Sequence, residues 1–146
     1  MTYQQSFAIS AAGMDVERLR VEVAALNLAN AHTVASSESE AYRPLQVIAQ
    51  ASTGTRASEG LFTALVDRAL SGPTATVEAT GLSPRRVLEA GHPYADAQGF
   101  VSYPGVDPAT EMLTLMSASR AYEANVAAMN AARTMALKAL DIGGST

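Results

Sequence analysis

The feature that most constrains this sequence is a long segment at each end whose apolar residues recur at helical spacing. The first runs from about residue 6 to residue 30, and its apolar residues recur at alternating steps of three and four: Ile9, Ala12, Val16, Leu19, Val23 and Leu26. This heptad pattern predicts an amphipathic helix. We expect Ser6 to be its N-cap and Asn30 its C-cap, the latter in the left-handed conformation that asparagine tolerates.

A second set of apolar residues recurs every seven residues in the same segment and falls on the opposite side of the predicted helix: Phe7, Met14, Val21 and Leu28. A helix on a protein surface normally has a single apolar face. Two interpretations remain open. Either the helix is fully buried in a small bundle, or one stripe contacts the rest of the chain and the other contacts a neighbouring subunit.

The second long segment runs from about residue 108 to residue 140. Asp107 suits the N-cap, Pro108 suits the first helical position, and Gly143-Gly144 predicts the end. Ser119 and Arg133 interrupt its heptad stripe, which otherwise holds apolar residues: Met112, Leu115, Tyr122, Val126, Met129, Ala136 and Leu140. Alanines cover much of the remaining surface, and few residues are charged. This helix, too, is predicted to make contacts on more than one side.

Residues 31–107 have a different character. Residues 33–40 are polar and predict a loop, while residues 61–70 fit a short helix. Four further stretches predict short strands of a small sheet: 42–50, 74–80, 85–89 and 99–103. We therefore expect an α+β protein, whose two terminal helices run antiparallel where they pair. Its expected regions are an N-terminal helix over 1–33, a small β-rich middle over 34–107 and a C-terminal helix over 108–146.

The side chains that carry chemistry are few. The 146 residues include no cysteine, which excludes disulfides, zinc–thiolate sites and thiol catalysis. His32 and His92 lie in different segments without the spacing of metal ligands, and we expect His92 to stabilise a turn. Residues 96–99 predict a turn, because they offer too few ligands for calcium. Nucleophile and phosphate-binding motifs are missing, so we expect no enzyme activity, no metal and no cofactor.

Charge and hydropathy exclude further classes of partner. The formal net charge is −4, so the basic surface of a nucleic-acid-binding protein is missing. No run of about 18 or more apolar residues is present, and we expect no transmembrane segment. The first residues lack the basic and apolar regions of a secretory signal peptide, so a role outside the cytoplasm needs another export route.

Polar residues on the predicted helices allow two roles. Asn27 and Asn30 end the first helix, and Asn125 and Asn130 lie on the second. Buried asparagines can fix the register between helices, although Asn30 also fits a cap. Arg133 occupies a nominal core position, from which it either reaches solvent or pairs with an acid of a neighbouring chain.

The two ends also carry a family resemblance. Residues 9–14 (Ile-Ser-Ala-Ala-Gly-Met) and 25–33 (Ala-Leu-Asn-Leu-Ala-Asn-Ala-His-Thr) resemble the N-terminal signature of flagellar rod and hook axial proteins. Residues 91–101 and 111–143 are similar to the basal-body rod proteins of that family. The signature differs at Ala25, where serine is usual, and at His32, where asparagine is usual.

The resemblance implies a structural subunit of the proximal rod, the drive shaft of the bacterial flagellar basal body. It implies terminal helices that form a coiled-coil inner domain lining the export channel, and export into the periplasm through the flagellar type III channel without a cleaved signal peptide. The implied partners are the rod proteins FlgB, FlgF and FlgG, FliE toward the base, and copies of the chain itself in a helical assembly.

The residues that we expect at the assembly interface lie on both helices: Phe7, Ile9, Ala12, Met14, Val16, Leu19, Val21, Val23, Leu26, Asn27, Leu28, Asn30, Met112, Leu115, Tyr122, Asn125, Val126, Met129 and Leu140. The alternative functions are a soluble helical adaptor or secreted binding protein, and a peptidoglycan-cleaving enzyme. The enzyme would need an acid placed for catalysis, and the sequence marks none.

Overall fold

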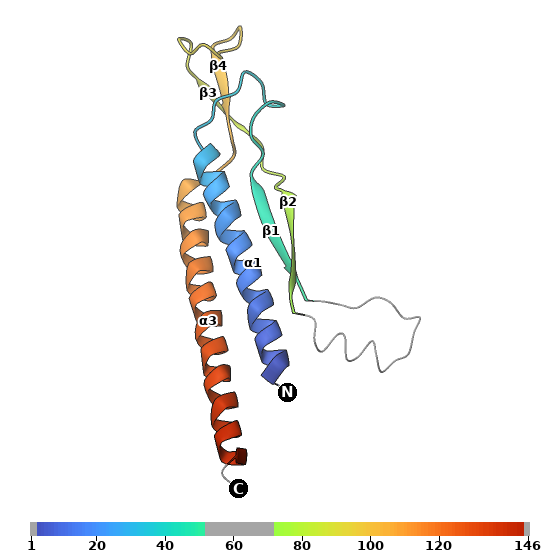
Figure 1. The fold of residues 1–146 in the computed structure, drawn as a ribbon. Helices are drawn as coiled ribbons and strands as arrows, with labels where there is room; N and C mark the ends of the chain where they lie inside the picture. Colours follow the sequence, from blue (N-terminus) through green and yellow to red (C-terminus); the bar gives the residue numbers. More distant parts are fainter. Residues whose placement is uncertain (1–2, 52–71, 145–146) are drawn as a thin grey trace, which may run out of the picture. The chain divides into compact units, whose positions relative to one another are not determined.

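The structure is a computed structural model that describes residues 3–51 and 72–144. Within these residues the elements are two long helices and four short strands (Figure 1): α1 (Tyr3–Asn30), β1 (Leu45–Gln50), β2 (Thr74–Ala79), β3 (Arg85–Leu88), β4 (Phe100–Tyr103) and α3 (Pro108–Gly144). The expected α+β class is confirmed. The helix predicted over residues 61–70 lies outside the described residues.

Helix α1 ends where the sequence predicts but begins earlier. It starts at Tyr3, so Ser6 lies inside the helix and the prediction that Ser6 is the N-cap is wrong. At the other end, the Asn30 side-chain amide donates a hydrogen bond to the Leu26 carbonyl oxygen at 2.8 Å. Among the described residues, only Gly99 has a positive φ, so Asn30 caps the helix through its side chain and not through a left-handed backbone.

Helix α3 begins as predicted and runs further than predicted. The Asp107 carboxylate accepts hydrogen bonds from the backbone N–H groups of Ala109 and Thr110, at 3.2 and 3.3 Å, as an N-cap residue does. The helix continues through Gly143 to Gly144. It therefore ends at the glycine pair that the sequence predicts as its end, four residues beyond Leu140.

The strands form two separate pairs and not the single small sheet that the sequence predicts. In the described chain, β1 pairs with β2, and β3 pairs antiparallel with β4 in a register that matches Arg85 with Tyr103. The other edge of β4 is occupied by Ala35, which exchanges backbone hydrogen bonds of 2.9 and 3.0 Å with Ser102. Ala35 therefore covers this edge of β4 at Ser102.

The chain divides into two compact units, and α1 and α3 each contribute to both. Among the described residues, the first unit takes 3–19, 49–51, 72–76 and 118–144, and the second takes 20–48 and 77–117. Small side chains dominate the buried positions. They are Val16, Ala118 and Ala132 in the first unit, and Val23, Ala24, Ala31, Ala41 and Val101 in the second. Asn27 and Ser102 are buried polar residues of the second unit.

Candidate assembly interface

The expected interface residues of α1 divide by burial. Val16, Val23 and Asn27 are buried, whereas Ile9 and Leu26 are more than 40% exposed. The others are half-buried: Phe7, Ala12, Met14, Leu19, Val21, Leu28 and Asn30. Neither predicted stripe is therefore covered along its whole length, and α1 keeps apolar surface on more than one side.

The expected interface residues of α3 are on average more exposed than those of α1. Met112, Tyr122 and Leu140 are exposed, with Leu140 at 71%. Leu115, Asn125, Val126 and Met129 are half-buried. The buried positions are Ala118 and Ala132, each one residue before the serine and arginine that interrupt the predicted stripe. Small residues therefore occupy the buried line of α3, and the large ones lie beside or opposite it.

Sequence reasoning missed further apolar residues on α3. Among the described residues, five more large side chains of this helix are at least half exposed: Leu113, Met116, Met135, Leu137 and Ile142. The sequence signal that could have predicted them is the spacing of Ala118 and Ala132, because small residues indicate which side of α3 packs closely within the subunit. Arg133, which the sequence placed in the stripe, is exposed.

In the first unit, α1 and α3 meet at a glycine. A Cβ atom added to Gly13 would lie 3.0–3.2 Å from the side-chain amide atoms of Asn125. Asn125 in turn donates a hydrogen bond to the Ala121 carbonyl oxygen at 3.1 Å. Glycine thus allows the asparagine amide to approach the backbone of α1 closely.

In the second unit, α1 and α3 are joined by Asn27. Its Nδ2 donates to Glu111 Oε1 at 3.0 Å and to the Leu45 carbonyl oxygen at 2.8 Å. Its Oδ1 accepts from the Leu45 N–H and from the Tyr42 hydroxyl, both at 2.9 Å. The Tyr42 pKa is raised, first by burial and then by the negative charge of Glu111.

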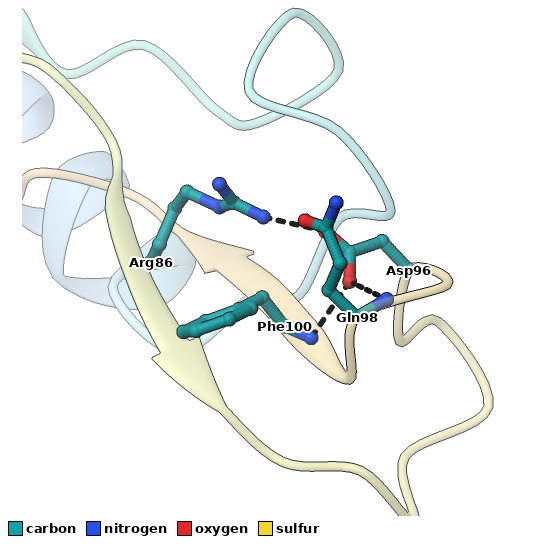
Figure 2. Close-up of polar contacts among 4 residues, drawn as sticks. All are labelled: Arg86, Asp96, Gln98 and Phe100. Carbon is teal, nitrogen blue, oxygen red and sulfur yellow. Dashed lines mark hydrogen bonds and ion pairs between the residues drawn. The ribbon is translucent and has the colours of Figure 1, made fainter.

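Asp96 is held by hydrogen bonds and an ion pair within the β3–β4 hairpin. The Asp96 carboxylate accepts from the backbone N–H groups of Gln98 and Phe100, at 2.8 and 2.9 Å, and pairs with Arg86 (Figure 2). The Arg86 guanidinium also lies over the Phe100 ring, 4.7 Å from its centroid. These contacts confirm the predicted turn at residues 96–99. The hydrogen bond from Phe100 N–H is the main cause that lowers the Asp96 pKa.

The hairpin turn also uses His92 as expected. The backbone N–H of Tyr94 donates to His92 Nδ1 at 3.2 Å, and the two rings lie 5.8 Å apart. In the described part of the chain, no three His, Asp or Glu side chains lie close enough to hold a metal ion. A hollow beside α1 is lined mainly by apolar or small residues, with Asp15 and Thr74 as its polar side chains.

No helix among the described residues combines the length and the apolar character that a bilayer span requires.

The C-terminal part of the chain matches a known protein family. The family model described as the C-terminal region of flagellar basal body rod FlgEFG proteins matches residues 97–142, which include β4 and nearly all of α3. This match points to the class of flagellar basal-body rod proteins, in agreement with the resemblance at the first helix.

Curated relatives extend the match over nearly the whole chain. The chain is 36% identical over 137 residues to the flagellar basal-body rod protein FlgC of Escherichia coli O6:H1, covering 94% of this chain and 95% of the relative. It is 37% identical to FlgC of Salmonella typhimurium LT2 with the same coverage, and 33% identical to FlgC of Bacillus subtilis 168, covering 98% and 99%. The chain belongs to the FlgC family of flagellar basal-body rod proteins.

This membership confirms the resemblance at both ends of the sequence. The chain is a structural subunit of the flagellar basal-body rod, and neither comparison leads to a catalytic family.

Proposed function

We propose that this rod subunit is built into the proximal rod by α1 and α3, which pair as an antiparallel coiled coil and present their remaining apolar surface to neighbouring subunits. The proximal rod acts as part of the drive shaft, and its helices line the export channel. The proposal follows the family membership and rests on the two-sided apolar character of the helices.

The observation that carries the proposal is the exposed apolar surface of α3. Eight large apolar side chains of the described helix are at least 40% exposed: Met112, Leu113, Met116, Tyr122, Met135, Leu137, Leu140 and Ile142. Burying one such side chain contributes about 1.5–3 kcal/mol. Large exposed apolar areas are uncommon on monomeric proteins, and so many exposed large apolar side chains on one helix favour an assembly that covers them.

Two polar contacts support the antiparallel coiled coil. Gly13 approaches Asn125 in the first unit, and Asn27 bonds Glu111 in the second. Asn27 lies 14 residues after Gly13, and Glu111 lies 14 residues before Asn125. Equal and opposite steps are what an antiparallel pair requires, and 14 residues are two heptads, which return to the same side of each helix.

The neighbours that we propose are FlgB, FlgF and FlgG, FliE at the base, and further copies of this chain. Contacts between unlike surface patches repeat without closing and generate helical assemblies. The two apolar sides of α1 and the exposed side of α3 are suited to such contacts. Among the predicted interface residues, the exposed ones are the most direct candidates: Ile9, Leu26, Met112, Tyr122 and Leu140.

We also propose that the subunit works in the periplasm and reaches it through the flagellar type III export channel. Membership in a family of flagellar basal-body rod proteins supports this route.

The test is purification of hook–basal bodies from detergent-lysed cells, compared with a strain that lacks the gene. We expect the chain to co-purify, and we expect the deletion strain to build no rod beyond the inner-membrane ring. A chain that stays in the soluble fraction, together with complete flagella in the deletion strain, would contradict the proposal and favour an adaptor.

A further inference from the structure

Asn27 is the most fully bonded buried side chain of the second unit. Its residue is 1% exposed, and its amide makes four hydrogen bonds to described residues. A carboxamide can donate two and, through the two lone pairs of its oxygen, accept two. Every hydrogen-bonding position of the Asn27 amide is therefore used inside this unit.

The four bonds join three parts of the chain that are distant in sequence. Tyr42 and Leu45 lie just before and at the start of β1, and Leu45 is bonded through both its N–H and its carbonyl oxygen. Glu111 lies in the first turn of α3, 84 residues from Asn27. Asn27 itself lies in the last turn of α1.

The orientation of the amide decides whether these bonds form. An ionised carboxylate can only accept hydrogen bonds, so Glu111 requires the NH2 side of Asn27 to face it. With Nδ2 fixed there, Oδ1 faces the Tyr42 hydroxyl and the Leu45 N–H. Without Glu111, a buried N–H would lack its partner, and an unpaired buried donor is costly.

We propose that Asn27 and Glu111 are positioning residues that make the docking of residues 42–45 on α1 depend on contact between α1 and the first turn of α3. Formation of the helix pair and order at the start of β1 then occur together. This role goes beyond membership in the rod and concerns how one subunit couples its helices to its strands. Only the basal-body measurement below rests on the proposed function.

The first test exchanges the donor and acceptor between the two residues, and it measures incorporation of the chain into hook–basal bodies. N27D places a buried carboxylate against two acceptors, and we expect incorporation to fall about tenfold or more. E111Q keeps an acceptor for Asn27 and should remain within about twofold of the unsubstituted chain. In N27D/E111Q, the amide introduced at position 111 can donate to the carboxylate introduced at position 27. Incorporation should therefore recover severalfold over N27D, although the Leu45 carbonyl still lacks its donor.

A29D is the matched control, because Ala29 lies two residues away on the same helix at an exposed position. We expect A29D to have a small effect and E111Q not to improve it. The proposal is overturned if N27D/E111Q incorporates no better than N27D, or if A29D is as harmful as N27D.

The second test measures chymotrypsin cleavage after Tyr42, both in the purified full-length chain and in basal bodies. E111A should increase this cleavage severalfold, E111Q should leave it nearly unchanged, and E123A at an exposed site of α3 serves as the control. Equal cleavage in E111A and E123A would overturn the proposal. Because the purified chain needs no rod, this result judges the inference even if the chain proves to be missing from basal bodies, which would contradict only the proposed function.

Discussion

The β3–β4 hairpin and helix α3 differ in how many of their side chains have partners within the subunit. In the hairpin, Asp96 binds two backbone N–H groups and an arginine, and Val101 and Ser102 of β4 are nearly inaccessible to solvent. In α3, the two buried residues of the described helix are Ala118 and Ala132, and eight large apolar side chains lie exposed. The hairpin finds its partners within its own unit, whereas α3 leaves much of its apolar surface without one in the described chain.

This difference indicates which surface of the subunit is available to bind its neighbours. A side chain whose bonds are made within the subunit adds to its stability, and a side chain left exposed adds to binding. Substitutions in the two regions should therefore have different effects: those in the hairpin should change stability, and those in α3 should change assembly.

Charge on the exposed side of α3 should have the largest effect. We expect L113D and L137D each to reduce incorporation into basal bodies about tenfold or more, because a buried leucine contributes about 1.5–3 kcal/mol and a buried carboxylate is costly. L88D places the same charge at an exposed leucine of the hairpin and should have little effect. Equal loss in all three variants would show that the added charge, and not loss of apolar contact by α3, is responsible.

A larger side chain at Gly13 should damage the contact of α1 with Asn125. We expect G13L to lower the free energy of unfolding by about 1–3 kcal/mol, since overpacking is destabilising. The double variant G13L/N125A should recover much of this loss, whereas A29L at an exposed site of α1 should change it by less than about 0.5 kcal/mol. Urea unfolding of the purified chain measures these values, and simple additivity of the two substitutions would argue against the contact.

Substitution of Asp96 should affect the hairpin and spare assembly. D96A removes the acceptor for the Gln98 and Phe100 N–H groups. D96N keeps that acceptor but turns its NH2 group toward Arg86 and loses the ion pair. The melting temperature should therefore fall more in D96A than in D96N. Incorporation of D96N should match that of the unsubstituted chain, and a loss as large as that of L137D would break the comparison between the two regions.

The smallest effect concerns pH. The pKa values of Asp96 and Asp107 are lowered from the ordinary 3.8, mainly by the Phe100 N–H bond in the first case and the Thr110 side-chain bond in the second. A lowered folded-state pKa contributes stability that is complete above the unfolded value and is lost as the pH falls through the folded value. Thermal unfolding should therefore show a loss of stability below pH 3.8. D96N/D107N should show a shallower loss, and an unchanged pH profile in that variant would contradict these assignments.

Much of the fold could be predicted from the sequence because its signals are local. Asp107 before Pro108 defines the start of α3, and alternating β-rich stretches define all four strands to within a few residues. The start of α1 could not be predicted, since Ser6 has the chemistry of a cap but the helix already runs through it.

The burial of the helices was less predictable. A heptad count favours the largest apolar residues, yet the buried line of α3 runs through Ala118 and Ala132, one position earlier. Close approach of two backbones favours small residues, and this depends on a partner that spacing alone does not reveal. The same holds for Asn27, whose partners Leu45 and Glu111 come from elsewhere in the sequence. The sequence suggested a register role for it, but not a junction with β1.

The most direct measurement uses the lack of cysteine in the chain. Single cysteines at Met116 and Leu137 on the exposed side of α3, and at Gln98 in the hairpin turn, are labelled with a maleimide in the purified chain and in purified basal bodies. The account predicts that all three positions react in the free chain, and that in basal bodies M116C and L137C are protected while Q98C still reacts. Equal labelling of M116C and Q98C in basal bodies would contradict the claim that α3 joins the subunit to its neighbours.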